Sequence, residues 1–315
     1  MKIIEVRDFS FCYANGSRES LSHVSLDVEE GTFNVLCGKS GCGKSTLLRQ
    51  LKSDLAPFGS SSGKICYYGR DLKEVGHRQQ SQEIGYVLQN PENQIVTDKV
   101  WHELAFGLES LGYDTPTIRL RVAEMASYFG IHQWFYKNVS ELSGGQKQLL
   151  NLAAIMAMHP KLLILDEPLD GLDPVMRKQI WTILMSEVAE RRTTVLVSSH
   201  NLRELEDVCD HVGIMNHGKV IIERSLFDLH GNISKIQVAC QTGMPKLPKE
   251  FEVLHMSNSG RVYTMIVKGN PREVAAAIQT EGDHLAIVDI LPLTLEEIFI
   301  YEMGGLGYEV KDILF

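Results

Sequence analysis

A glycine-rich loop with apolar flanks carries the strongest chemical signal in the chain. An apolar strand pattern (33–37) precedes it and an apolar helix pattern follows, which is the setting in which G-x-x-x-x-G-K-[ST] binds phosphate. Glycines allow successive backbone N–H groups to form a concave anion site. We expect Lys44 to reach the β- and γ-phosphates and the Ser45 hydroxyl to hold Mg²⁺. The sequence therefore predicts a nucleoside triphosphate site at Gly38, Lys39, Ser40, Gly41, Cys42, Gly43, Lys44, Ser45 and Thr46.

Two adjacent carboxylates follow an apolar segment (161–165) that is typical of a buried parallel strand. Ligands of α/β proteins bind at the carboxyl ends of such strands. We expect Asp166 to act on Mg²⁺ through water, and Glu167 to position or deprotonate the attacking water. Gln89 and His200 end two other predicted strands (84–90 and 193–199). Each alone is ordinarily a structural residue, but four polar groups at one sheet edge favour a functional site.

A second helix start contains glycines. Ser143 is a candidate N-cap for a helix over 147–158, and Gly144, Gly145 and Gln146 follow it. Two glycines before a helix leave N–H groups available to an anion. Taken alone, the pattern favours an ordinary capped helix over an anion site.

Tyr13 and Cys42 each have two interpretations. Tyr13 continues an alternation with Phe9 and Phe11, so it is either a cross-strand packing residue or a platform for a nucleotide base. Cys42 lies within the predicted phosphate site, where positive potential is expected to lower the pKa of its thiol. On that basis alkylation would inactivate the protein and Mg-ATP would protect it; the alternative is a small filling residue.

The periodicity divides the chain at about residue 225. In the first part, strands are expected at 3–13, 21–28 and 64–68, with a Gly/Ser-rich bend at 59–63. Helices at 97–112 and 117–130 form a helical insert over about 90–141. The tail, 226–315, has strands at 233–240, 251–256, 262–268 and 285–291, a helix at 271–280, and a Thr294/Glu297 capping box. We expect a small α+β domain that serves packing and dimer support rather than ligand sensing.

Composition excludes several classes of protein. Of the 315 residues, 44% are hydrophobic and 23% charged, as in a globular protein, and the net charge of −9 argues against nucleic acid as a partner. Six cysteines lack C-x-x-C spacing, which fits a reducing cytosol. The amino terminus lacks a signal-peptide pattern and no apolar run has the length of a membrane span. Any membrane role is therefore expected to come through a partner.

Together these motifs resemble the ATP-binding subunits of ABC transporters over about residues 1–225. The resemblance rests on the order of the phosphate loop, Gln89, the Leu142–Gln146 signature, the LLILDEP segment (162–168) and His200. It implies a P-loop NTPase ABC ATPase domain of the α/β class, with a mixed sheet core and a helical subdomain. It also implies that Tyr13 stacks on adenine, that Gln89 contacts Mg²⁺ and couples to the membrane partner, and that the Asp170–Asp173 segment lines a dimer contact.

The resemblance also implies an assembly. One chain carries two anion-binding helix starts, whereas ATP has one triphosphate. A second ABC ATPase subunit, identical or related, would place its Ser143-Gly144-Gly145 start over the γ-phosphate held by the first. Hydrolysis would then release the pair and move membrane-spanning permease subunits. The chain would lie at the cytoplasmic face of the cell membrane as a peripheral subunit.

The subfamily and the transport direction stay open at this point. Residues 89–113 and 141–160 resemble energy-coupling factor importers, whereas residues after about 168 resemble exporter ATPases. Leu149 and Leu169 depart from common family residues. Alternatives are a soluble ABC-type ATPase acting on ribosomes or DNA, which usually carries two cassettes, and a metabolic P-loop kinase, which needs an acceptor pocket.

Overall fold

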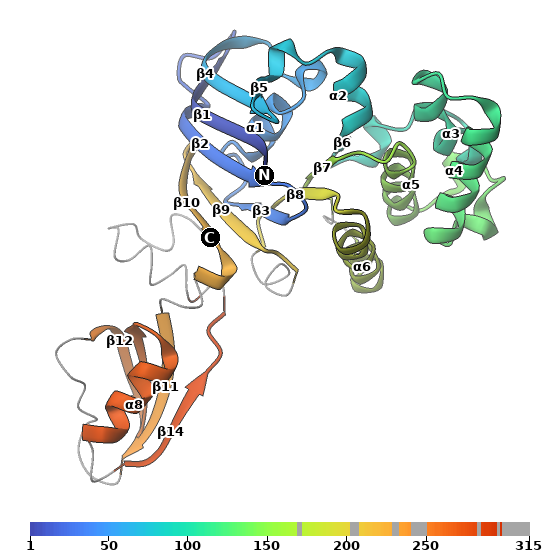
Figure 1. The fold of residues 1–315 in the computed structure, drawn as a ribbon. Coiled ribbons are helices and arrows are strands. Elements are labelled where there is room, and N and C mark those ends of the chain that lie inside the picture. The colour runs from blue at the N-terminus through green and yellow to red at the C-terminus, as the bar shows by residue number, and fades with distance from the viewer. Residues whose placement is uncertain are drawn as a thin grey trace. The chain divides into compact units, whose positions relative to one another are not determined.

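The computed structural model describes residues 1–168, 172–201, 208–228, 233–240, 251–281 and 285–294, together with Glu297. The chain forms two compact units, which are coloured from blue to yellow and from yellow to red in Figure 1. The first comprises Met1–His200 and His211–Glu223, and the second Asn201–Asp210 and Arg224–Phe315.

An antiparallel sheet of four strands opens the first unit. Its order is β2 (Leu21–Glu29), β1 (Lys2–Tyr13), β4 (Gly59–Tyr67) and β5 (Arg70–Asp71). Residues 59–62 do not form the predicted bend, because they pair with β1 from Tyr13↔Gly59 to Ser10↔Ser62. Glycine is needed at Gly59, since a Cβ there would lie 2.1 Å from the Cys12 carbonyl oxygen. Gly63 has φ +81°, at the register shift where the strand bends.

The second sheet of this unit carries the predicted chemistry. Its order is β10 (Lys219–Ser225), β9 (His211–Asn216), β3 (Phe33–Cys37), β8 (Thr194–Ser199), β7 (Leu162–Asp166) and β6 (Ile84–Val87). Strands β3, β6, β7, β8 and β9 run parallel along it, so their carboxyl ends meet at one edge. β3 and β7 are buried along their full lengths, as parallel strands covered on both faces are.

Strand β6 is shorter than predicted. It ends at Val87, two residues before Gln89. The cause is the side chain of Gln94, which accepts a hydrogen bond from Leu88 N at 2.8 Å and donates one to the Tyr86 carbonyl at 2.9 Å. These bonds replace a sheet partner, and Gln89 therefore lies on the loop that leaves the strand.

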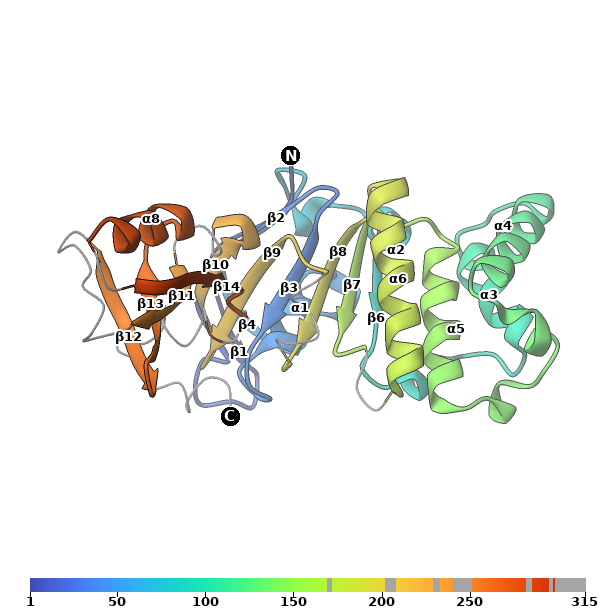
Figure 2. The same ribbon diagram turned by 90° about the horizontal axis from the view of Figure 1, so that it is seen from below.

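The helices of this unit are α1 (Lys44–Gln50), α2 (His77–Glu83), α3 (Val100–Ser110), α4 (Thr115–Tyr128), α5 (Gly144–Met156) and α6 (Pro174–Arg191). Figure 2 shows α3 and α4 together at one end of the unit, away from the sheet. The helix α3 packs against α4 and α5. It begins three residues later than predicted, because the Glu103 carboxylate accepts hydrogen bonds from Val96 N and Thr97 N. The sequence had not revealed α2 or α6. No helix within the described ranges is long and apolar enough to cross a membrane.

The second unit is an antiparallel sheet with one described long helix. Its order is β12 (Glu252–Ser259), β13 (Val262–Lys268), β11 (Ile233–Cys240) and β14 (Leu285–Leu291), with α8 at Pro271–Glu281. Ile236, Val238, Met265 and Val274 form its core. The predicted capping contacts are present: Glu297 N donates to Thr294 Oγ1 at 3.2 Å, and Thr294 N to Glu297 Oε2 at 3.1 Å. Most of the helix that would follow lies outside the described residues.

Candidate active site

The glycine-rich loop joins the buried strand β3 to α1 and fits closely against the β9–β10 turn. A Cβ at Gly38 would lie 2.3 Å from the Met215 carbonyl oxygen, so only glycine is accommodated there. The Cys42 carbonyl accepts a hydrogen bond from Gly218 N at 2.8 Å. Gly43 caps α1 with φ +111° and no side-chain hydrogen bond. The loop is therefore shaped by its neighbours in the fold as well as by its own glycines.

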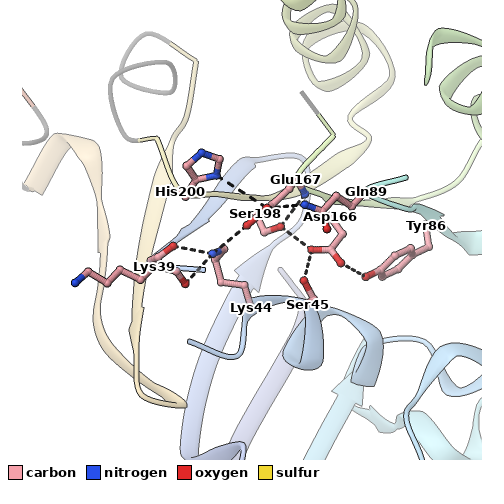
Figure 3. Close-up of polar contacts among 10 residues, drawn as sticks. Lys39, Lys44, Ser45, Tyr86, Gln89, Asp166, Glu167, Ser198 and His200 are labelled. Carbon is pink, nitrogen blue, oxygen red and sulfur yellow. Dashed lines mark hydrogen bonds and ion pairs between the residues drawn. The ribbon is translucent and has the colours of Figure 1, made fainter. Parts of the chain in front are cut away.

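Lys44 is buried beneath this loop, with 3% of its side chain exposed. Its ammonium donates to the Gly38 carbonyl at 2.6 Å and to the Lys39 carbonyl at 3.2 Å, while the Lys39 side chain is directed away (Figure 3). The same ammonium lies 3.1 Å from Glu167 Oε1. One cation thus links the phosphate loop to the carboxylate that follows β7.

Asp166 is 1% exposed and is held by hydroxyl groups from three elements. Ser45 Oγ and Ser198 Oγ donate to Asp166 Oδ1 at 2.8 and 2.9 Å, and the Tyr86 hydroxyl lies 3.3 Å from Oδ2. Burial, and then the charge of Asp166, raises the pKa of Tyr86 well above its usual range, so its phenol stays a donor. The side-chain oxygens of Ser45 and Asp166 lie together here. This arrangement fits Mg²⁺, an ion whose oxygen ligands are usually one or two carboxylates together with phosphates and waters.

Gln89 and His200 converge on Glu167, as Figure 3 shows. Gln89 Nε2 donates to Glu167 Oε2 at 2.9 Å, and His200 Nδ1 lies 4.0 Å from the same oxygen. Half of the His200 side chain is exposed, against 10% of Glu167. The structure therefore brings together Lys44, Gln89, Glu167 and His200, four residues that are far apart in the sequence.

A cleft of about 510 Å³ opens above the loop. Tyr13 lies in its wall; the Tyr13 hydroxyl is 3.0 Å from Thr46 Oγ1, and its ring packs edge-on against Phe11. With 39% of Tyr13 exposed, its ring is both packed and open to the cleft. Sequence reasoning missed five further lining residues, which come from the loop after β1 and from the β9–β10 turn: Arg18, Glu19, Ser20, His217 and Gly218. The Asn-His-Gly turn was the only signal for the last two.

The second glycine-containing helix start does not line this cleft. Ser143 caps α5: its hydroxyl accepts from Gln146 N at 3.3 Å, and Gln146 Oε1 accepts from Ser143 N at 2.9 Å. Ser143 and Gly144 are exposed, and no described residue lies within 4 Å of a Cβ built on Gly144. The Asp173 carboxylate caps α6 by accepting from Val175 N and Met176 N, each at 3.0 Å. Asp170 lies outside the described residues.

The prediction of an activated Cys42 thiol was wrong. Its side chain is 7% exposed and belongs to the hydrophobic core cluster. Desolvation outweighs the positive charge of Lys44 and raises the pKa of the thiol. The loop presents its backbone to the cleft and turns this sulfur toward Gly38, where an added Cβ would meet it at 2.8 Å.

Comparison with known proteins identifies one family. The family model described as ABC transporter matches residues 21–170, and a model described as an AAA domain matches residues 136–206. An ABC transporter ATP-binding protein of Bacillus cereus is 40% identical over 78% of this chain, which covers 44% of the relative. The chain thus spans less than half the length of that relative.

Two shorter proteins match over most of their own lengths. The energy-coupling factor transporter ATP-binding protein EcfA1 of Oenococcus oeni is 34% identical, over 73% of this chain and 81% of the relative. The structure of cbiO1 from Clostridium perfringens, part of the ABC transporter complex cbiONQ, has a TM-score of 0.64 and 30% identity. That match covers 71% of this chain and 88% of cbiO1.

Proposed function

Because this chain belongs to the ABC transporter ATP-binding proteins, we propose that it binds and hydrolyses ATP to drive a membrane transporter. The observation that carries the proposal is the meeting of Lys44, the phosphate loop and Glu167 at one end of a parallel sheet. Such an arrangement has a cation for the phosphates and a carboxylate for the attacking water. The kinase alternative is disfavoured, because the carboxylate of Glu167 beside Asp166 suits the activation of a water molecule better than the binding of a phosphoacceptor.

The nucleotide would lie in the cleft, with its base near Tyr13 and its phosphates over residues 38–46. Lys44 would then exchange its contact with Glu167 for the β- and γ-phosphates, leaving Glu167 Oε1 to accept a proton from water. Gln89 and His200 would orient Glu167 and the γ-phosphate from the other side. Mg²⁺, when bound, would neutralise phosphate charge, and Ser45, Asp166 and Gln89 would hold it.

We further propose that the active form is a two-fold dimer with a second ABC ATPase subunit. The signature residues Ser143, Gly144, Gly145 and Gln146 lie outside the chain's own cleft, and the helix start they form is exposed. A dimer would bring this start, with the nearby Asp173, to the γ-phosphate of the partner. Each nucleotide would then be held by both subunits, and hydrolysis would separate them.

The experiment that tests this function compares Glu167→Gln with the wild type. Wild-type protein is expected to release phosphate from Mg-ATP, and the variant to lose about 100-fold or more of that rate while still binding ATP. It should also remain an ATP-loaded dimer in size-exclusion chromatography. Glu83→Gln is the control, since Glu83 pairs with Lys161 at the opposite, amino-terminal end of the sheet. An inactive wild type would contradict the ATPase, and an ATP-loaded monomeric variant would contradict the dimer.

The membrane-spanning permease subunits are proposed to dock on a groove beside the Gln89 loop. This groove, of about 550 Å³, is lined by Val96, Phe106 and Leu111 among others, and by the polar groups Lys52 and Asn151. Phe106→Asp is expected to abolish copurification with a membrane protein while ATP binding persists. Leu120→Asp is the control, because Leu120 is an exposed apolar residue of α4 outside the groove. Peripheral location at the cytoplasmic membrane face follows from this contact and is tested by the same copurification.

A further inference from the structure

Ser198 lies next to the two carboxylates, although no sequence motif drew attention to it. It sits on β8, which pairs in parallel with β7 in the register Asp166↔Ser198. Its side chain is completely buried. Figure 3 shows its hydroxyl between Asp166 and the start of Glu167.

The directions of its two hydrogen bonds follow from the chemistry of its partners. Glu167 N donates to Ser198 Oγ at 2.9 Å, and Ser198 Oγ lies 2.9 Å from Asp166 Oδ1. An amide nitrogen does not accept and an ionised carboxylate does not donate, so the hydroxyl must accept from Glu167 and donate to Asp166. A single buried hydroxyl thus connects the backbone of one carboxylate residue to the side chain of the other.

The backbone at Glu167 needs such an anchor. Its φ is +45°, in the left-handed region that costs a residue with a Cβ about 1–3 kcal/mol. A conformation of this kind persists only where surrounding contacts hold it. This turn directs the Glu167 carboxylate back toward Lys44 and Gln89. If the Glu167 amide lost its acceptor, the carboxylate would be free to leave that orientation.

We propose that Ser198 is a positioning residue for ATP hydrolysis, which acts by holding Glu167 through its backbone N–H, while its bond to Asp166 fixes the hydroxyl in the orientation that accepts. This inference rests on the proposed function, since it gives Ser198 a role only in the chemical step. Because Ser198 does not line the cleft, it acts on the rate of hydrolysis and leaves the binding of nucleotide largely unchanged.

The test compares Ser198→Ala with a control that removes another buried hydroxyl of the same strand. Thr194 Oγ1 accepts a hydrogen bond from Gly31 N at 2.9 Å, at the end of β8 away from the carboxylates, so Thr194→Val is the match. Ser198→Ala is expected to lower kcat by about 10- to 100-fold, with KM and the Kd for ATP within about twofold of wild type. Thr194→Val should lose thermal stability to a similar extent but keep its kcat.

Two further variants separate positioning from a loss of packing. Ser198→Thr keeps the hydroxyl, and its kcat is expected to exceed that of Ser198→Ala by about fivefold or more. In a Glu167→Gln background, Ser198→Ala should lower the remaining rate by less than about twofold, because the residue through which it acts has been disabled. An equal, multiplicative loss in both backgrounds would overturn the inference.

The outcomes for Ser198 and for the proposed function are distinct. A wild-type protein without ATPase activity contradicts the function itself. An active wild type whose Ser198→Ala variant keeps its kcat, or loses only ATP affinity, contradicts the positioning role and leaves the function intact.

Discussion

The two glycine-containing helix starts of the first unit are built differently. At the phosphate loop, α1 has Gly43 as its N-cap with no side-chain hydrogen bond, and Lys44 is buried beneath the loop. At the signature, Ser143 and Gln146 cap α5 reciprocally, and a Cβ at Gly144 would have no described residue within 4 Å. The loop lines the cleft of about 510 Å³, whereas the signature residues do not line that cleft.

This difference indicates what each start requires. The phosphate loop has its cation, its carboxylates and its walls within one chain, so it is expected to bind nucleotide alone. The α5 start is capped by its own side chains, and it lies outside the cleft that the phosphate loop lines. We therefore expect its contribution to appear only when a second subunit covers it.

The largest effect is expected from Lys44→Ala. The variant removes the buried ammonium that contacts Gly38, Lys39 and Glu167, and with it a charged partner of the phosphates. ATP affinity should fall about 100-fold, the value of a strong charge-assisted hydrogen bond, and turnover should be lost. Isothermal titration calorimetry measures the affinity. Lys161→Met, at the other end of the sheet, should bind ATP normally, and unchanged affinity of the Lys44 variant would contradict the site.

The second largest effect is expected from a change in the signature, which tests the contribution of a second subunit. A Cβ at Gly144 has no neighbour within 4 Å in the described part of the chain, so Gly144→Asp is expected to fold normally. Its negative charge would face the partner's γ-phosphate, and we expect at least a tenfold loss of ATP-dependent dimer and of hydrolysis, with monomer affinity for ATP retained. Analytical ultracentrifugation with and without ATP measures this.

The control for that variant is Gly76→Asp. Gly76 also precedes a helix, has an ordinary backbone conformation, and has open space around its Cα. It lies far along the chain from the signature and should form the dimer as the wild type does. Equal losses in both variants would point to a nonspecific effect of the added charge.

A smaller effect is expected from the cap itself. Ser143→Ala removes the hydroxyl that accepts from Gln146 N, and should cost about 1 kcal/mol of unfolding free energy. Urea denaturation followed by circular dichroism measures the change, with exposed Ser140→Ala as the comparison. A stability equal to that of the Ser140 variant would show that the reciprocal contacts of Ser143 and Gln146 do not stabilise α5.

The smallest effect concerns the reactivity of Cys42. Since burial raises its thiol pKa, the thiolate fraction at pH 7 is below that of an ordinary cysteine and increases as the pH rises toward that pKa. Iodoacetamide should therefore modify Cys42 more slowly than the half-buried Cys12 and Cys66, and faster at pH 9 than at pH 7. Mass spectrometry of the labelled peptides measures this, and denatured protein should lose the difference. Preferential labelling of Cys42 at pH 7 would instead support the sequence-based prediction of an activated thiol.

Local patterns predicted most elements of the fold. Alternation identified β11, β13 and β14 to the residue, and the Ser143 cap and the Thr294/Glu297 contacts follow from neighbouring side chains. Predictions were wrong where distant residues intervene. Residues 59–63 form a strand because β1 supplies partners, and β6 ends at Val87 because Gln94 binds it. The electrostatic prediction for Cys42 had considered charge without burial.

The functional groups of this protein can be recognised in short sequence motifs, because a phosphate loop, a carboxylate pair and a capped helix start each depend on adjacent residues. Their combination is tertiary. Parallel pairing of β6, β7 and β8 brings Gln89, Glu167 and His200 together, and places the Ser198 hydroxyl between two carboxylate residues. Strand order and burial depend on the whole core rather than on any single segment. The position of a catalytic group is therefore set by contacts that no local pattern contains.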